Sequence, residues 1–195
     1  MFTLGQRIFG TGGPTGSRGK RVSAIQVRRA QPHDVPDVAK FAAELYTLHH
    51  GWDPVRFWDL GAMSASRQAG REKFFLSLLD DPTALLWIAK QDQRAVGYAF
   101  AGLESHDYEN LLEEALWVHD LYVVPEVRGL GVADQLLAAA AAHGREVGCP
   151  LLVLTVAEAN TRAQSFFARH GARVTMREMT LDLRAAGAED VPRTT

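Results

Sequence analysis

The segment from residue 115 to 133, ALWVHDLYVVPEVRGLGVA, constrains the fold more than any other part of the chain. It begins as a strand rich in branched and aromatic residues and continues into a loop with two glycines. It then opens a helix whose apolar residues recur at helical spacing as far as Val147. This order places free backbone N–H groups at a helix start, where the helix dipole favours an anion. The segment predicts an α/β domain with an anion-binding loop.

The rest of the chain alternates between strand and helix patterns. Strands are expected at 24–30, 83–90, 95–102, 151–156 and 172–183, because these runs are apolar or alternate with a period of two. Helices are expected from a cap at Asp34, in the region before Leu79, and from about Thr161 to Arg169. We predict one domain over residues 24–185. Residues 1–23 form a flexible, glycine-rich basic tail in this interpretation, and residues 186–195 form a C-terminal tail.

Composition excludes several functional classes. The chain has 195 residues and 21 basic against 23 acidic side chains, which argues against a general nucleic-acid binder. No apolar run approaches the roughly 20 residues needed to span a bilayer, and no secretory signal is visible, so we expect a soluble cytoplasmic protein. The single cysteine, Cys149, excludes an intrachain disulfide and a cysteine-cluster metal site. No metal is expected.

Three kinds of phosphate-binding loop could explain the glycines after Val124. A P-loop is excluded because no Gly-Lys-Ser/Thr follows. A dinucleotide fingerprint is excluded because Asp134 stands where a third glycine is required, and because the motif lies late in the chain. The remaining pattern is Arg-x-x-Gly-x-Ala, formed by Arg128, Gly131 and Ala133.

This loop, preceded by a strand ending LYVVP, resembles the coenzyme A loop of the GNAT superfamily of N-acetyltransferases. The later segment AEANTRAQSFFARHGA has Asn160, Ala163, Phe166 and Gly171 where that family has Asn, Ala, Phe and Gly. The resemblance covers roughly residues 25–183. It implies a mixed sheet of six or seven strands with helices on both faces and a splayed parallel strand pair, which receives the pantetheine arm of acetyl-CoA.

The resemblance also implies a set of residues that contact coenzyme A. Several have a structural reading as well: the glycines can serve a tight turn, Asn160 can cap its helix, and adjacent aromatics at a helix end usually belong to a core. Both readings stay open here. The implied coenzyme A contacts are Leu121, Tyr122, Val123, Arg128, Gly129, Leu130, Gly131, Val132, Ala133, Asn160, Ala163, Phe166 and Phe167.

Acetyl transfer to an amine needs an uncharged nucleophile, a stabilised oxyanion and a proton for the departing thiolate. A backbone N–H between Leu121 and Val123 can meet the oxyanion. His119 and Asp120 precede it and are candidate bases, although a hydrogen-bonded structural pair is an equal alternative. Strand alternation predicts that their side chains point to opposite faces.

Within the superfamily, the segments HDLYV, VAEAN and FFARHGA look most like the branch that acetylates polyamines and diamines. His119 replaces the first residue of an acidic pair in that branch, and Phe167 replaces the tyrosine that acts as general acid. Either Tyr122 or Tyr108 substitutes, or the thiolate leaves unaided. The resemblance therefore implies acetyl transfer from acetyl-CoA to a primary amine of a small molecule in a ternary complex, and a possible homodimer. A non-catalytic acyl-CoA-binding or sensing module is the alternative.

Two features bear on the acceptor. Residues 104–114 carry five carboxylates and no Lys or Arg, which would gather cations or form a solvated acidic loop. Tyr46, Trp52 and Trp58 lie in the helical region that covers the acceptor site in this family. They could pack against an amine or belong to the core.

Overall fold

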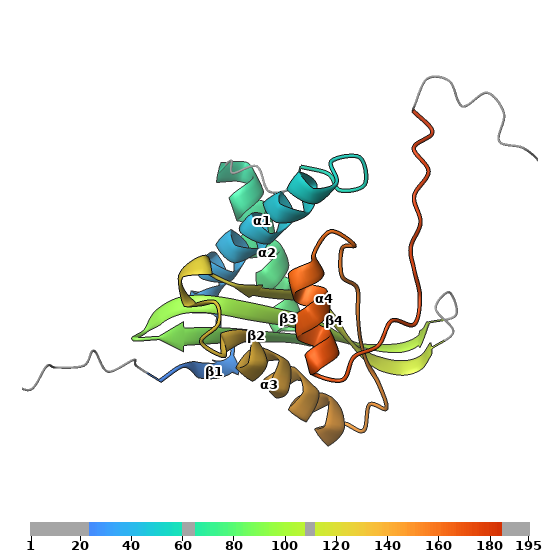
Figure 1. The fold of residues 1–195 in the computed structure, drawn as a ribbon. Helices are drawn as coiled ribbons and strands as arrows, with labels where there is room; N and C mark the ends of the chain where they lie inside the picture. Colours follow the sequence, from blue (N-terminus) through green and yellow to red (C-terminus); the bar gives the residue numbers. More distant parts are fainter. Residues whose placement is uncertain (1–23, 60–64, 108–111, 185–195) are drawn as a thin grey trace, which may run out of the picture.

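The computed structural model describes residues 24–59, 65–107 and 112–184, drawn in Figure 1. One sheet of five strands is flanked by helices. Two short 3-10 turns, Pro32–Asp34 and Pro125–Val127, precede helices α1 and α3. The strands are β1 Gln26–Arg29, β2 Ala84–Gln91, β3 Arg94–Asp107, β4 Leu112–Val123 and β5 Leu152–Leu154, and the helices are α1 Val35–Trp52, α2 Ala65–Leu79, α3 Val132–Glu146 and α4 Thr161–Arg169.

The strands lie in the order β1-β2-β3-β4-β5, antiparallel except for the parallel pair β4–β5. Helices α1 and α2 cover one side of this sheet, and α3 covers the other (Figure 1). On the α3 side, a Cβ added to Gly144 would lie 3.2 Å from the side chain of Leu116, so glycine allows the helix to approach β4 closely. The α/β class and the mixed sheet with helices on both faces are confirmed.

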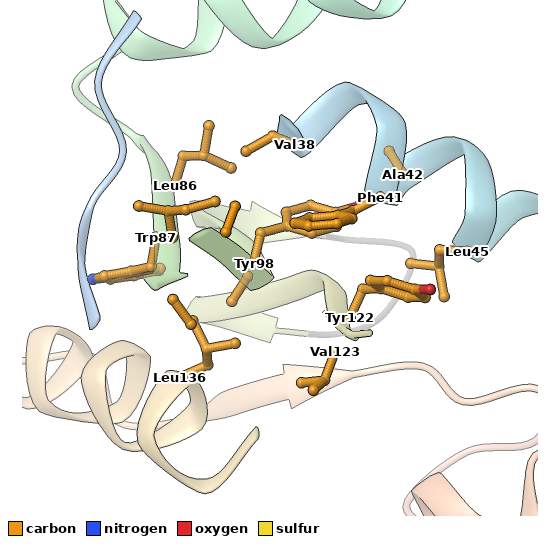
Figure 2. Packing of buried hydrophobic residues seen from close by; sticks show 14 of the residues in the cluster. Val38, Phe41, Ala42, Leu45, Leu86, Trp87, Tyr98, Tyr122, Val123 and Leu136 are labelled. Atoms are coloured by element: carbon orange, nitrogen blue, oxygen red, sulfur yellow. The ribbon is translucent and has the colours of Figure 1, made fainter. Parts of the chain in front are cut away.

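The core lies mainly between α1 and the sheet. Helix α1 buries Val35, Val38, Phe41 and Leu45, which recur at the spacing of one helical face. The ring of Phe41 stacks on Tyr122 of β4 and Tyr98 of β3, with centroids 5.6 and 6.4 Å apart (Figure 2). Two polar aromatic residues of the central strands are thereby held under α1.

Asp34 anchors the start of α1, but not by the predicted helix cap. Its side chain is fully buried and makes no capping hydrogen bond to α1. Instead, its carboxylate accepts a hydrogen bond of 2.7 Å from Arg28 and lies 2.7 Å from the Lys90 ammonium. Burial alone would raise the pKa of Asp34, yet the bonds from Arg28, Lys90 and the Gln31 backbone hold that pKa far below its usual value. This carboxylate joins β1, β2 and α1.

The predicted strand at 172–183 is wrong. Residues 172–182 have no regular secondary structure and are largely exposed, so the described sheet has five strands where six or seven were expected. The strand pattern is present in the sequence, but no neighbouring strand of the described chain pairs with it. The expected strand at 151–156 is shortened to Leu152–Leu154.

Several expectations fall on other parts of the chain. The tails at 1–23 and 186–195 and Tyr108 lie outside the described residues, so the domain limits remain a prediction. Within the described ranges, no helix is both long enough and apolar enough to cross a membrane.

Candidate active site

Strands β4 and β5 lose contact halfway along β4. The pairing runs from Leu116 opposite Leu152 to Val118 opposite Leu154. Beyond that point β4 continues to Val123 and, among the described strands, pairs only with β3. This is the geometry expected of the splayed parallel pair. It leaves the β5 side of residues 119–123 without a neighbouring strand.

The open edge of β4 carries backbone donors at the predicted positions. The Val124 N–H points to β3 and donates to Val96 O of that strand at 3.0 Å. Val123 O points the other way and accepts a bond of 2.9 Å from the Arg128 side chain. Because successive residues of a strand direct their backbone groups to opposite sides, the N–H groups of Leu121 and Val123 face the open edge. These two groups can bind an acyl oxygen or the amides of a pantetheine arm.

The loop after β4 has the backbone that its sequence predicts. Gly129 and Gly131 have φ angles of 87° and 79°, the left-handed region that favours glycine. Gly131 is the N-cap of α3, and no side chain caps the helix there. The N–H groups of the first turn, including those of Val132 and Ala133, are therefore available to an anion. Leu130 between the glycines is half exposed.

Arg128 points back to the sheet. Its Nε donates to Val123 O, and its guanidinium lies 5.7 Å from the centroid of the Tyr122 ring. The Tyr122 hydroxyl in turn donates to the Glu44 carboxylate of α1 at 2.5 Å. Burial, followed by the contact with Glu44, raises the pKa of Tyr122 well above its usual value. This chain of contacts fixes the end of β4 against α1.

A β-bulge brings His119 and Asp120 to the same face of the sheet. Phe100 lies opposite Asp120 but Ala101 lies opposite Val118, so His119 is the extra residue. The His119 ring stacks on Phe100 with centroids 4.9 Å apart, and Asp120 accepts a bond of 2.8 Å from the Tyr98 hydroxyl. The expectation of opposite faces is wrong, because the bulge breaks the alternation between these two residues.

Asp120 is a partly buried carboxylate on the α1 side of the sheet. Burial raises its pKa, and the bond from Tyr98 and the nearby His119 and His49 offset part of that effect. Burial and the charge of Asp120 also raise the pKa of Tyr46 of α1, which packs against the core. A carboxylate with a raised pKa is a better proton acceptor than an ordinary aspartate at neutral pH.

His119 forms a second polar pair with Glu104 of β3. His119 Nε2 and Glu104 Oε1 are 2.9 Å apart and each side chain is 38% exposed, so the pair faces solvent beside Asp120. A Cβ added to Gly102 would lie 3.2 Å from His119 Nε2, so the glycine makes room for the imidazole. The sequence placed Glu104 in an acidic segment and offered it as an alternative base to His119 and Asp120, and the structure shows that it contacts His119.

Helix α4 has a local cap, an aromatic pair within it and one ion pair to α3. Asn160 Oδ1 accepts a bond of 3.1 Å from the Ala163 N–H, which confirms its role as helix cap. Phe167 is buried and its ring meets that of Phe166 edge-on at 5.1 Å. His170 pairs with Asp134 of α3 at 3.1 Å, which ties α4 to the first turn after the glycine loop.

The other candidate residues are not brought together. Trp58 is 78% exposed, and Trp52 packs edge-on against His49 with centroids 5.0 Å apart. Sequence reasoning missed Tyr98 and Glu44. The former had a detectable signal, because a tyrosine in an apolar strand needs a partner for its hydroxyl.

No group of His, Cys, Asp or Glu within the described ranges has the arrangement of a metal site. The protein class that fits this site is an acyl-transferring enzyme. The site has an open strand edge, a helix start without a side-chain cap, and adjacent carboxylates. Residues 45–172 match the Acetyltransferase (GNAT) family, and since this match covers most of the chain, the protein belongs to that family and is an acyltransferase.

Named relatives and a solved structure agree with this assignment. The chain is 25% identical over 150 residues to an uncharacterized N-acetyltransferase of Archaeoglobus fulgidus, covering 76% of this chain and 93% of that protein. It is 34% identical over 80 residues to the aminoglycoside N(6')-acetyltransferase type 1 of Salmonella typhimurium, covering 40% of this chain and 54% of that one.

The fold is similar to that of an aminoglycoside N-acetyltransferase solved in complex with CoA. The TM-score is 0.62 at 22% identity, covering 85% of this chain and 99% of the other. These likenesses do not point to the polyamine branch.

Proposed function

We propose that this protein is an acetyl-CoA-dependent N-acetyltransferase that acetylates the primary amine of a small cationic molecule by direct attack in a ternary complex. The observation that carries the proposal is the open edge of β4 at residues 119–123. It places two backbone donors, Leu121 and Val123, next to a partly buried carboxylate with a raised pKa, Asp120.

Acetyl-CoA would lie between the glycine loop and α4. Its pyrophosphate would accept bonds from the N–H groups of Gly129, Gly131, Val132 and Ala133, and its pantetheine amides would pair with the open edge of β4. Arg128 contributes by holding the end of that edge in place. The solved aminoglycoside N-acetyltransferase, which contains CoA, supports this cofactor. Residues of α4 would line the other side of the cleft, namely Asn160, Ala163, Phe166 and Phe167.

The acceptor enters as an ammonium ion and must lose a proton. Glu104 and His119 face solvent and would receive the cation, and Asp120 would take its proton, directly or through water. The nitrogen lone pair then attacks the thioester carbonyl carbon. The negative charge on oxygen is met by the N–H groups of Leu121 and Val123. The C–S bond then breaks as the nitrogen releases its second proton to water, which gives the amide and the thiolate.

In this proposal the thiolate leaves without a residue that protonates it. Phe167 has no hydroxyl, and Tyr122 donates its hydroxyl to Glu44 and has a raised pKa, which makes it a poor acid. We therefore assign Tyr122 a structural role, in which its ring shapes the side of the site next to α1. A thiol has a pKa of about 8.5, so its thiolate can leave and be protonated by water.

The acceptor class is a small molecule with more than one cationic group. The carboxylates of Glu104 and Asp120 support this class, and so do the aminoglycoside acetyltransferases among the similar proteins. The residues HDLYV and FFARHGA support polyamines and diamines within the same class. Both are primary amines that carry further positive charges.

The test is turnover. Release of free CoA from acetyl-CoA is measured with a panel of aminoglycosides, polyamines, amino acids and peptides, and coenzyme A binding is measured by calorimetry. We expect turnover with a polycationic amine, and Asp120→Asn should lower kcat while the affinity for coenzyme A is unchanged. The matched variant His119→Gln should mainly raise KM.

Two outcomes would contradict the proposal. Coenzyme A binding without turnover on any amine would favour the non-catalytic binding module. Full activity in Asp120→Asn would remove this carboxylate from the proton transfer.

A further inference from the structure

One ion pair beside the glycine loop has no part in the proposed reaction. Asp134 is the third residue of α3 and lies in its first turn, after the N-cap Gly131. Its Oδ2 atom turns back toward the start of the helix, because a Cβ added to Gly131 would lie 3.9 Å from it. A carboxylate therefore stands beside the free N–H groups to which we assigned the pyrophosphate of coenzyme A.

This carboxylate has two opposite effects. In the free protein, Asp134 is a negative charge at the positive end of the α3 dipole, which stabilises the helix. Toward the pyrophosphate it is a like charge at short distance, and like charges at short distance repel. Taken alone, Asp134 would weaken the binding of an anion at the loop. A cation beside it would offset this repulsion.

The structure places His170 beside this carboxylate. Its Nε2 atom lies 3.1 Å from Oδ1 of Asp134, and its Nδ1 atom lies 2.9 Å from the backbone oxygen of Phe166. Both partners only accept hydrogen bonds, so a neutral imidazole with one N–H can bond to one of them, whereas the doubly protonated ring bonds to both. His170 is also the C-cap residue of α4, where the helix dipole favours a positive charge. The surroundings of the ring thus fit its charged form.

The same pair is a polar link between α4 and the rest of the fold. Among the described residues, no other hydrogen bond or ion pair joins α4 or its C-cap to a helix or strand. The neighbouring Arg169 donates to Ser165 O of its own helix, and the ring centroids of His170 and Phe166 are 4.5 Å apart. Within the described part of the chain, Asp134 is therefore the charged side chain that His170 contacts.

We propose that His170 is a positioning residue for coenzyme A, which holds the Asp134 carboxylate and offsets its charge so that the first turn of α3 can accept the pyrophosphate. The inference rests on the proposed placement of the pyrophosphate at the glycine loop. It also has a reciprocal consequence, because a proton that strengthens the binding of a ligand is itself bound more tightly when that ligand is present. Coenzyme A binding should therefore draw a proton onto His170.

The experiment is calorimetry of coenzyme A binding to the full chain. Titrations in two buffers with different heats of ionisation give both the affinity and the number of protons taken up. They are made from about pH 6 to 9, the range in which histidine titrates in most folded proteins. The wild type should take up part of a proton in this range. His170→Gln should lose that uptake and bind coenzyme A about tenfold more weakly, as expected of one uncompensated charge near the anion.

Further variants separate an effect of charge from simple tethering of the two helices. Asp134→Asn removes the repulsion together with the pair, so it should bind coenzyme A at least as tightly as the wild type. In that background, His170→Gln should change the affinity less than it does alone. The matched control is His143→Gln at the other end of α3, where His143 faces Glu146 at 3.7 Å. Its affinity and proton uptake should equal those of the wild type.

Unchanged affinity or unchanged proton uptake in His170→Gln would overturn the proposal. Weaker binding in Asp134→Asn would overturn it as well, because the pair would then act only as a tether, and this result decides the matter even where His170→Gln fails to fold. Gly131→Val tests the underlying placement separately. If this variant binds coenzyme A normally, the pyrophosphate lies elsewhere and both proposals fail. If it loses binding while His170→Gln binds normally, only the role of His170 is refuted.

Discussion

The bond between Tyr98 and Asp120 offers a direct test of the proposed base. The Tyr98 hydroxyl donates to the Asp120 carboxylate at 2.8 Å, and this bond opposes the effect of burial on the pKa of Asp120. Tyr98→Phe removes the bond and keeps the ring against Phe41 and Phe75. The pKa of Asp120 should therefore rise further above its ordinary value.

The size of the effect follows from the strength of such a bond. A hydrogen bond to a charged group contributes about 1.5–3 kcal/mol, and about 1.4 kcal/mol corresponds to a factor of ten in the ionisation constant. The base acts only when Asp120 is ionised, so activity rises with pH through this pKa. In Tyr98→Phe the acidic limb of kcat/KM should move to higher pH by roughly one unit or more.

The assay is CoA release against pH with one accepted amine, for the wild type and two variants. Tyr122→Phe is the matched control, because it removes a tyrosine hydroxyl from the same face that bonds to Glu44 and not to Asp120. Its acidic limb should stay in place. An unmoved limb in Tyr98→Phe, or a shift to lower pH, would falsify the assignment of Asp120 as base.

Three further predictions concern other contacts. Asp120→Asn, which should have a lowered kcat, should be more stable than the wild type at neutral pH, measured by thermal unfolding, because a raised folded pKa means that ionisation opposes folding. Gly131→Val should weaken coenzyme A binding in calorimetry, since φ is 79° at this position, whereas Gly148→Ala, with φ of 81° at the other end of α3, should bind normally. Asp34→Asn leaves Lys90 buried without its partner and should cost about 3–5 kcal/mol in chemical denaturation. In the wild type, the stabilisation that ionised Asp34 gives the folded state should be fully present above the unfolded carboxyl pKa of about 3.9. It should be lost as the pH falls through the lower pKa of Asp34 in the folded state.

Local chemistry made the glycine loop predictable. Gly129 and Gly131 adopt left-handed backbone, and an amphipathic helix begins directly after them, so all the relevant signals lie within a few residues. The cap at Asn160 is local in the same way. A strand followed by such a loop and helix needs no knowledge of distant parts of the chain.

The arrangement around Asp120 was not predictable from the pattern. A period-two reading assigned His119 and Asp120 to opposite faces, and only pairing with β3 shows that His119 is an extra residue. The partners Tyr98 and Glu104 come from another strand, and their contacts depend on its register. The predicted strand at 172–183 failed for a related reason, because strand propensity cannot say which edge a strand will join.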